Sequence, residues 1–329
     1  MSGEPRVIRL ATRGSPLALA QARIVSDLLA TVWGDQIATE LVVVDTTGDR
    51  SQHVPIHAIG GQGVFVKEVD AAVRAGRADV AIHSAKDLPS SAAGVDEDPD
   101  RHGEPAGEPC IIAVPKRADP RDALVGSALS DLRPGARVAT GSVRRRAQLA
   151  WLRPDLMFTE LRGNMATRLG KVPEGGAVVV AMAALVRLDC AEKAAEALSV
   201  TSMLPQVGQG AIAVCARPDD EDAASWLAPI EDRRARIGLD AERAYLRGVG
   251  GGCDLPVGAY AVVGDDDSIE LEAIIASLDG HTLVRERATG TRPEVVGAEL
   301  ARRILDDAGG RSLLERSGLG AAPSGGTPP

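Results

Sequence analysis

Short apolar runs alternate with stretches of helical periodicity along the first part of the chain. Residues 7–11 form an apolar run, and Ser15 and Pro16 then precede apolar residues that recur at helical spacing as far as residue 32. Serine at the N-cap with proline in the first turn is a helix-start signal. A β-branched run at residues 41–44 is of the kind buried in a parallel sheet. The pattern predicts strand, helix and strand in that order.

The same alternation continues to about residue 216. Ser142 is placed to cap a further helix, and residues 90–109, rich in Pro, Gly, Asp and Glu, predict a surface excursion between two domains. Strands that alternate with helices are typical of α/β proteins with largely parallel sheets. The predicted strands lie at residues 79–83, 110–114, 137–140, 157–161, 177–181 and 211–216.

From residue 230 the pattern changes character. A charged helix leads to a glycine-rich loop, three strands near residues 257–263, 269–276 and 282–288, and a helix over residues 293–308. This segregation of elements predicts a small α+β domain. The Gly- and Pro-rich tail is predicted to be disordered. The predicted domains are an α/β domain of residues 1–109 with 211–229, an α/β domain of residues 110–210, an α+β domain of residues 230–317, and the tail 318–329.

The composition is that of an ordinary soluble globular protein, with 44% hydrophobic and 25% charged residues. The chain has no apolar run long enough to span a bilayer, and its start lacks the apolar core of a secretory signal. A net charge of −9 and 2% aromatic residues argue against a nucleic-acid partner. The four cysteines form no CxxC pair and have no histidine at metal-ligand spacing, so we expect no metal site, no disulfide framework and a cytoplasmic location.

Arginines nevertheless gather at the carboxyl ends of the predicted strands. Open α/β sheets place their ligands at that edge, so these arginines should share one site. A guanidinium group matches a carboxylate in a bidentate manner, and one short basic cluster does not make an extended phosphate track. The sequence therefore predicts a polyanionic small-molecule substrate. The arginines concerned are Arg13, Arg144, Arg145, Arg162, Arg168 and Arg187.

Lys86 and Asp87 directly follow the strand predicted at residues 79–83. An adjacent Lys-Asp pair on a loop is usually solvated surface, and such pairs are weak. At the carboxyl end of a strand, however, a carboxylate can serve as a proton donor and later as counter-ion to a cation. His83 fits a packed strand-end residue better than a base. Both interpretations of Asp87 remain open on these residues alone.

Two glycine-rich loops are further candidates. The loop at residues 60–63 lacks the glycine spacing and the terminal Lys-Ser/Thr of a phosphate loop, and we interpret it as a flexible active-site loop carrying Phe65. The glycines at residues 250–252 leave the approach to Cys253 free of side chains. Its thiol either anchors a bulky group or is an incidental cysteine in a glycine-rich turn.

Four motifs follow one another along the chain: ATRGSPLAL at residues 11–19, HSAKDLP at residues 83–89, LRGN at residues 161–164 and GGC at residues 251–253. In this order they resemble the porphobilinogen deaminase family, also called hydroxymethylbilane synthase, and the resemblance runs from about residue 8 to residue 314. It implies two periplasmic-binding-protein-like (type II) α/β domains that enclose a cleft, plus a small C-terminal α+β domain. It also implies that Cys253 holds a dipyrromethane cofactor through a thioether.

The resemblance implies stepwise head-to-tail condensation of four porphobilinogens, with loss of ammonia at each step, to give hydroxymethylbilane. It assigns to Asp87 the departure of the amine and the stabilisation of the resulting azafulvenium cation. Cofactor and substrate carboxylates would be bound by Arg13, Ser15, Lys86, Ser142, Arg144, Arg145, Arg162 and Arg168, with Arg187 in the same cleft. Thr140 and Gly163 match the polar turns around these residues, and Phe65 matches an aromatic residue of the mobile loop.

Three positions depart from the pattern of the family. Gln62 stands where many members have Lys, Gly250 replaces a common Glu, and Cys215 stands where a Glu is usual. None of them removes the anchor or the acid, so we expect an active enzyme, working as a monomer on a small-molecule substrate without a nucleic-acid or membrane partner. Two other classes of protein fit the sequence less well. A small-anion binding protein leaves Cys253 unexplained, and a nucleotide-binding enzyme would need better-spaced glycine loops.

Overall fold

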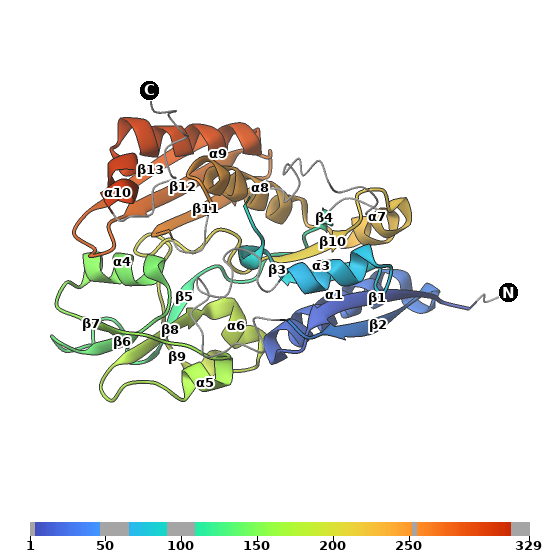
Figure 1. Ribbon diagram of the computed structural model, residues 1–329, viewed down its shortest axis with the longest axis horizontal. Coiled ribbons are helices and arrows are strands. Elements are labelled where there is room, and N and C mark those ends of the chain that lie inside the picture. The colour runs from blue at the N-terminus through green and yellow to red at the C-terminus, as the bar shows by residue number, and fades with distance from the viewer. Residues whose placement is uncertain (1–3, 47–65, 91–108, 252–254, 317–329) are drawn as a thin grey trace, which may run out of the picture.

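The computed structural model describes residues 4–46, 66–90, 109–251 and 255–316, which form three sheets with their covering helices (Figure 1). Two of the sheets have five strands and the third has three. Among the described helices, none is both long and apolar enough to cross a membrane.

The first sheet has the strand order β2-β1-β3-β10-β4. Strands β1 (Arg6–Arg13), β2 (Ile37–Val44) and β3 (Val80–Ser84) are parallel, whereas β10 (Ile212–Ala216) runs antiparallel between β3 and β4 (Cys110–Ala113). The predicted domain boundary puts β4 in the second domain, but the backbone of β4 pairs with β10 of the first sheet. We therefore propose that the first domain extends through β4.

The first helix of this unit begins where the sequence predicts. Helix α1 (Pro16–Trp33) has Ser15 as its N-cap, and the Ser15 hydroxyl accepts from the backbone N–H of Ala18 at 3.3 Å. With α7 (Glu221–Leu227) it covers one face of the sheet, and α3 (Lys67–Arg74) covers the other. The prediction that residues 41–44 are buried holds only for Val44, which is 8% exposed, because β2 is an edge strand and Val43 is 55% exposed.

The second sheet repeats this arrangement with the order β7-β6-β8-β5-β9. Its three parallel strands β7, β6 and β8 were predicted, but the antiparallel strand β5 and the edge strand β9 were missed. Helix α4 (Val143–Leu152) begins at Ser142, whose hydroxyl accepts from the backbone N–H of Arg145 at 3.4 Å. The strands are β5 (Asp122–Gly126), β6 (Arg137–Ala139), β7 (Met157–Thr159), β8 (Ala177–Ala181) and β9 (Ala194–Ala197), with the short helices α5 (Met165–Leu169) and α6 (Met182–Arg187).

Two connecting segments, residues 114–121 and 205–211, carry the chain out of the first sheet and back into it. They run side by side, since the Ala118 N–H donates to the Gly210 carbonyl at 3.1 Å. In each five-stranded sheet one strand, β10 or β5, runs antiparallel to the other four and directly adjoins a connecting segment. This is the order of type II periplasmic-binding-protein-like domains, so the predicted fold class is confirmed.

The third unit is a three-stranded antiparallel sheet covered by helices, as predicted. Helices α8 (Arg233–Gly248) and α9 (Pro293–Arg302) pack on one face of the strands β11 (Val257–Val263), β12 (Ile269–Ala276) and β13 (Leu283–Gly290). After α9 the chain continues through a π-helical turn (Arg303–Asp307) into α10 (Gly310–Arg316).

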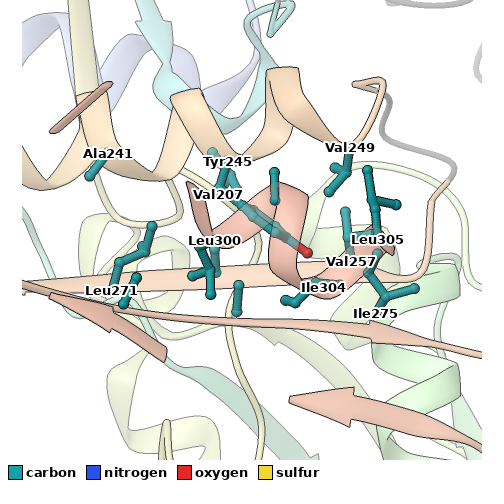
Figure 2. Packing of buried hydrophobic residues seen from close by; sticks show 14 of the residues in the cluster. Val207, Ala241, Tyr245, Val249, Val257, Leu271, Ile275, Leu300, Ile304 and Leu305 are labelled. Carbon is teal, nitrogen blue, oxygen red and sulfur yellow. The ribbon is translucent and has the colours of Figure 1, made fainter. Parts of the chain in front are cut away.

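Figure 2 shows the apolar side chains between these helices and strands. The Tyr245 ring is fully buried there, and its hydroxyl donates to the Ile274 carbonyl at 2.9 Å, which satisfies its polar atom. Gly297 lets α9 approach α8 closely, because a Cβ at that position would lie 2.4 Å from the Ala241 carbonyl oxygen. Helix α8 also contributes Leu239 to the core of the first sheet, so it joins the third unit to the first.

Candidate active site

The first sheet presents Lys86 and Asp87 where it meets the second connecting segment. Strand β3 ends at Ser84, and a single 3-10 turn (Ala85–Asp87) carries both side chains. Gly208, at φ +72°, allows the connecting segment to lie against this turn, because a Cβ there would be 3.0 Å from the Lys86 backbone nitrogen. The Ala85 N–H donates to the Ala211 carbonyl at 3.1 Å. Lys86 and Asp87 therefore have a fixed backbone at the junction of the two α/β units.

A buried carboxylate, Asp122, lies beside the carboxyl end of β8 in the second sheet, and nothing in the sequence indicated its role. It is the first residue of β5 and is fully buried. Arg144 Nη2 lies 2.8 Å and Arg145 Nη2 2.7 Å from its two oxygens. Burial alone raises the pKa of Asp122, but the charges of Arg144 and Arg145 and a hydrogen bond from Gln209 outweigh it and bring this pKa to about 2. Asp122 is therefore ionised, and the two arginines balance its negative charge.

The two arginines lie deeper than a strand-exit position suggests. Arg144 is 3% exposed and Arg145 7%, and each also donates to a backbone carbonyl, of Leu204 at 2.6 Å and of Val179 at 3.0 Å respectively. Charged groups are buried at this depth only when they are paired and hydrogen-bonded. Both guanidinium groups accordingly have structural partners, and Arg145 still faces the junction between the units.

The turns at the ends of β6 and β7 hold the other predicted residues of the second unit. The Ser142 N–H donates to the Thr140 hydroxyl at 3.2 Å, and Arg168 Nε donates to the Gly163 carbonyl at 2.8 Å. Gly163 has φ +111°, a conformation that favours glycine. Arg162 is partly exposed, and its Nη2 lies 3.7 Å from Glu160.

Arg13, Ser15 and Arg187 lie at the ends of β1, α1 and α6. Arg13 is the last residue of β1, and the Ser15 hydroxyl is engaged as the cap of α1. Arg187 ends α6 and donates through Nη2 to the Gly210 carbonyl at 2.7 Å. Burial lowers the pKa of Arg187 to about 10, which leaves it charged at neutral pH. Helices α1 and α6 contact each other, so these residues come from elements that meet.

The charges at the junction act on one another. Burial, followed by the nearby charge of Arg145, lowers the pKa of Lys86 to about 8, although its side chain keeps some contact with solvent. Burial and the charge of Arg145 likewise lower the pKa of Arg168, and the Asp87 carboxylate opposes that effect. Lys86, Asp87, Arg145 and Arg168 therefore belong to one cluster. Its cations can bind carboxylates, and its carboxylate can exchange a proton or face a cation.

Several predicted residues lie outside the described residues, namely Gln62, Phe65 and Cys253. The chain that leads to Cys253 is described up to Gly251: after α8 the Gly251 N–H donates to the Leu246 carbonyl at 2.8 Å, and Gly250 and Gly251 both have positive φ. Cys215 is buried in β10, where burial raises the pKa of its thiol, so it packs as a core residue. Within the described ranges, His, Cys, Asp and Glu form no group that could hold a metal ion.

Fold and site together define a protein of two type II α/β units with a cationic junction and a third, α+β unit. The family model described as "Porphobilinogen deaminase, dipyromethane cofactor binding domain" matches residues 8–225, and "Porphobilinogen deaminase, C-terminal domain" matches residues 238–306. The chain belongs to the porphobilinogen deaminase family, as its motifs predict.

Curated relatives agree with this assignment. Porphobilinogen deaminase of Syntrophus aciditrophicus is 42% identical over 94% of this chain and 98% of the relative. That of Roseiflexus sp. (strain RS-1) is 45% identical over 93% of this chain and 97% of the relative. Among solved structures, the methionine binding protein MetQ matches with a TM-score of 0.40 and 12% identity, over 68% of this chain and 89% of that one. A likeness of that size adds nothing to the assignment.

Proposed function

We propose that this protein is a transferase that condenses four porphobilinogen molecules head to tail, releases ammonia at each step and forms hydroxymethylbilane for porphyrin biosynthesis. The family membership supports this activity. The observation that carries the proposal is the cluster at the junction, where the charges of Lys86, Arg145 and Arg168 act on one another beside Asp87. Porphobilinogen bears an acetate and a propionate, so a growing chain gains carboxylates that such cations bind.

The cofactor of this reaction is dipyrromethane, which we propose to be held by Cys253 through a thioether. The described residues fit such a group: Gly250 at φ +95° has open space around the position of a Cβ, and the cations of the junction suit its carboxylates. When bound, the dipyrromethane supplies the pyrrole end to which substrate units are joined. Lys86, Arg145, Arg162 and Arg168 would hold the carboxylates of the cofactor and substrate, with Arg13, Ser15, Ser142 and Arg187 as further members of the site.

Asp87 is the proposed acid. Its carboxyl group would donate a proton to the leaving amine of porphobilinogen, and the resulting carboxylate would then face the cation left on that substrate. The fixed 3-10 turn Ala85–Asp87 supports this role, because a charge held at a set position stabilises a developing charge without reorganisation. Lys86 and Arg168 would keep the substrate's own carboxylates away from Asp87 by binding them.

The test is single-turnover ammonia release from holo-protein carrying Asp87→Asn or Asp87→Glu, with cofactor loading checked by mass. General acid–base catalysis contributes about 10²–10⁴-fold, so the asparagine variant should be slower by that factor, and the glutamate variant should retain more activity. Asp79→Asn is the matched control, because Asp79 precedes the same strand and pairs with Arg9 at 2.8 Å, at the end away from the junction.

Equal rates for the parent and Asp87→Asn would show that the proton and the counter-charge come from another group. An unmodified mass together with no consumption of porphobilinogen would reject the proposed function and favour a small-anion binding protein.

We also propose that the enzyme works as a monomer in the cytoplasm, with porphobilinogen as its partner. The three described cysteines, Cys110, Cys190 and Cys215, are free thiols, which suits a reducing compartment. Light scattering of the holo-protein tests the oligomeric state, and a mass of two chains would contradict it.

A further inference from the structure

Gln209, in the second connecting segment, has a fully buried side chain that touches both α/β units. Its Oε1 accepts from Lys86 Nζ at 3.3 Å and from Arg145 Nη2 at 3.4 Å. Lys86 belongs to the turn after β3 of the first sheet, whereas Arg145 belongs to α4 of the second unit. One amide oxygen therefore holds two cations from different units.

The orientation of this amide is determined by its other end. Gln209 Nε2 donates to the Pro120 carbonyl at 2.7 Å and to Asp122 Oδ1 at 2.9 Å. Both of these partners accept hydrogen bonds and neither donates, so the amide nitrogen must face them and the amide oxygen must face the cations. The backbone is fixed as well, because Arg117 Nε donates to the Gln209 carbonyl at 2.9 Å.

We propose that Gln209 is a positioning residue for the proposed reaction: it holds Lys86 and Arg145 together at the junction so that both face the carboxylates of the substrate. This inference rests on the proposed function and deepens it. Two like charges this close repel each other, and an acceptor shared by both offsets that repulsion. Without it, the two cations would separate toward their own units.

The glutamine side chain is uncharged, and this matters for its role. A carboxylate at position 209 would neutralise one of the cations that it holds, whereas the amide leaves their charge available for the substrate. The charged groups that act on Lys86 are Arg145 and Arg168, which disfavour its ammonium form, and Asp87 and Asp122, which favour it. Gln209 adds a hydrogen bond to the ammonium form without changing this balance of charge.

The experiment measures the titration of Lys86 directly. Holo-protein is treated with limiting acetic anhydride between pH 6 and 10, and acetylation of Lys86 is quantified by peptide mass spectrometry; only the neutral amine reacts. In Gln209→Met, which keeps the length of the side chain but lacks the amide acceptor, the pKa of Lys86 should fall from about 8 by about one unit, so that acetylation at pH 7 rises about fivefold.

Gln148→Met is the matched control. Gln148 of the second unit is likewise a buried glutamine, but its two hydrogen bonds are to the backbone of Leu204, at 2.8 and 2.9 Å. A merely structural role of Gln209 predicts that both variants unfold at lower temperature while Lys86 titrates as in the parent. Our proposal predicts that only the change at Gln209 moves this titration.

The same variants separate binding from chemistry. Gln209→Met should raise KM for porphobilinogen about tenfold, as expected for a lost charge-assisted contact, and should change kcat less. If Gln209→Met does not fold, Gln209→Asn takes its place, because it keeps the amide but is one methylene too short to reach both cations. An unchanged Lys86 titration in whichever variant folds would overturn the proposal.

The failure of this inference can be told apart from the failure of the proposed function. A parent protein that carries no adduct and consumes no porphobilinogen would reject the activity, while a shifted Lys86 titration would still show the Gln209 contact. An active parent with an unshifted titration would reject the role of Gln209 alone.

Discussion

Replacing Asp122 with asparagine should strongly destabilise the second α/β unit. The change removes the negative charge shared by Arg144 and Arg145 and leaves their guanidinium groups, which are 3% and 7% exposed, without it. Removing one partner of a buried ion pair costs about 3–5 kcal/mol. The asparagine side chain keeps the shape and one acceptor, so we expect the lower end of that range, about 3 kcal/mol.

The pKa of Asp122 gives a second measure of the same interaction. The folded protein lowers this pKa from 3.8 to about 2, which favours the ionised form by an energy on the order of 2 kcal/mol. Because the pKa is lower in the folded than in the unfolded chain, this stability is present above about pH 4 and is lost as the pH falls through about 2. Acid should therefore lower the stability of the second unit in the parent protein, and should lower it less in Asp122→Asn.

The assay is hydrogen exchange of backbone amides in β5 and β8, because a single unfolding free energy is poorly defined for a protein of several units. Arg145 donates to the Val179 carbonyl in β8, so this strand should lose protection in the variant. The matched control is Asp155→Asn in the same unit: Asp155 pairs with Arg153 at 2.7 Å but is exposed, and exposed pairs contribute little. If Asp122→Asn and Asp155→Asn lose equal protection, the buried pair is not a stabilising contact.

Three further predictions concern other parts of the molecule. Glu242→Gln should weaken the attachment of the third unit to the connecting segments and lower the free energy of unfolding by about 3–5 kcal/mol, because buried Glu242 pairs with Arg117 at 2.6 Å and accepts from the Gly208 N–H. Hydrogen exchange of the backbone amides in α8 tests this, and protection equal to that of the parent would contradict it. Cys253→Ser should fold but lack the adduct and nearly all activity, because a hydroxyl is a poorer nucleophile than a thiolate; full turnover would disprove the anchor. Affinity for porphobilinogen should decline as the pH rises through about 8, where Lys86 loses its charge, and a constant KM between pH 7 and 9 would refute this.

Local sequence signals predicted the features of the fold that depend on local structure. Ser15 and Ser142 cap their helices as expected, because a cap is set by a serine hydroxyl and the N–H groups of the next turn. The buried strand β8 follows from five consecutive apolar residues. Strand β5 was missed because its run is short and begins with a charged residue, Asp122, and β9 because Ala and Glu are poor strand formers.

Contacts between distant residues could not be predicted from such signals. The sequence indicated that cations follow the strands, but it gave no sign that Asp122 would neutralise part of their charge. Gln209 is 123 residues from Lys86 in the chain, and the two meet only because the second connecting segment returns beside β3. The pairing of β4 with β10 was not predicted for the same reason, since β10 lies far along the chain.

The buried carboxylate and the buried amide have different consequences for the charge of the junction. Asp122 neutralises charge deep in the second unit, which allows Arg144 to serve as a structural cation. Gln209 neutralises nothing, so Lys86 and Arg145 keep an excess of positive charge where the two units meet. A substrate that gains two carboxylates with every condensation needs such an excess, and burial makes each charge more effective than it would be in water. An acidic protein can thus bind a polyanion, because the positive charge is concentrated at one junction.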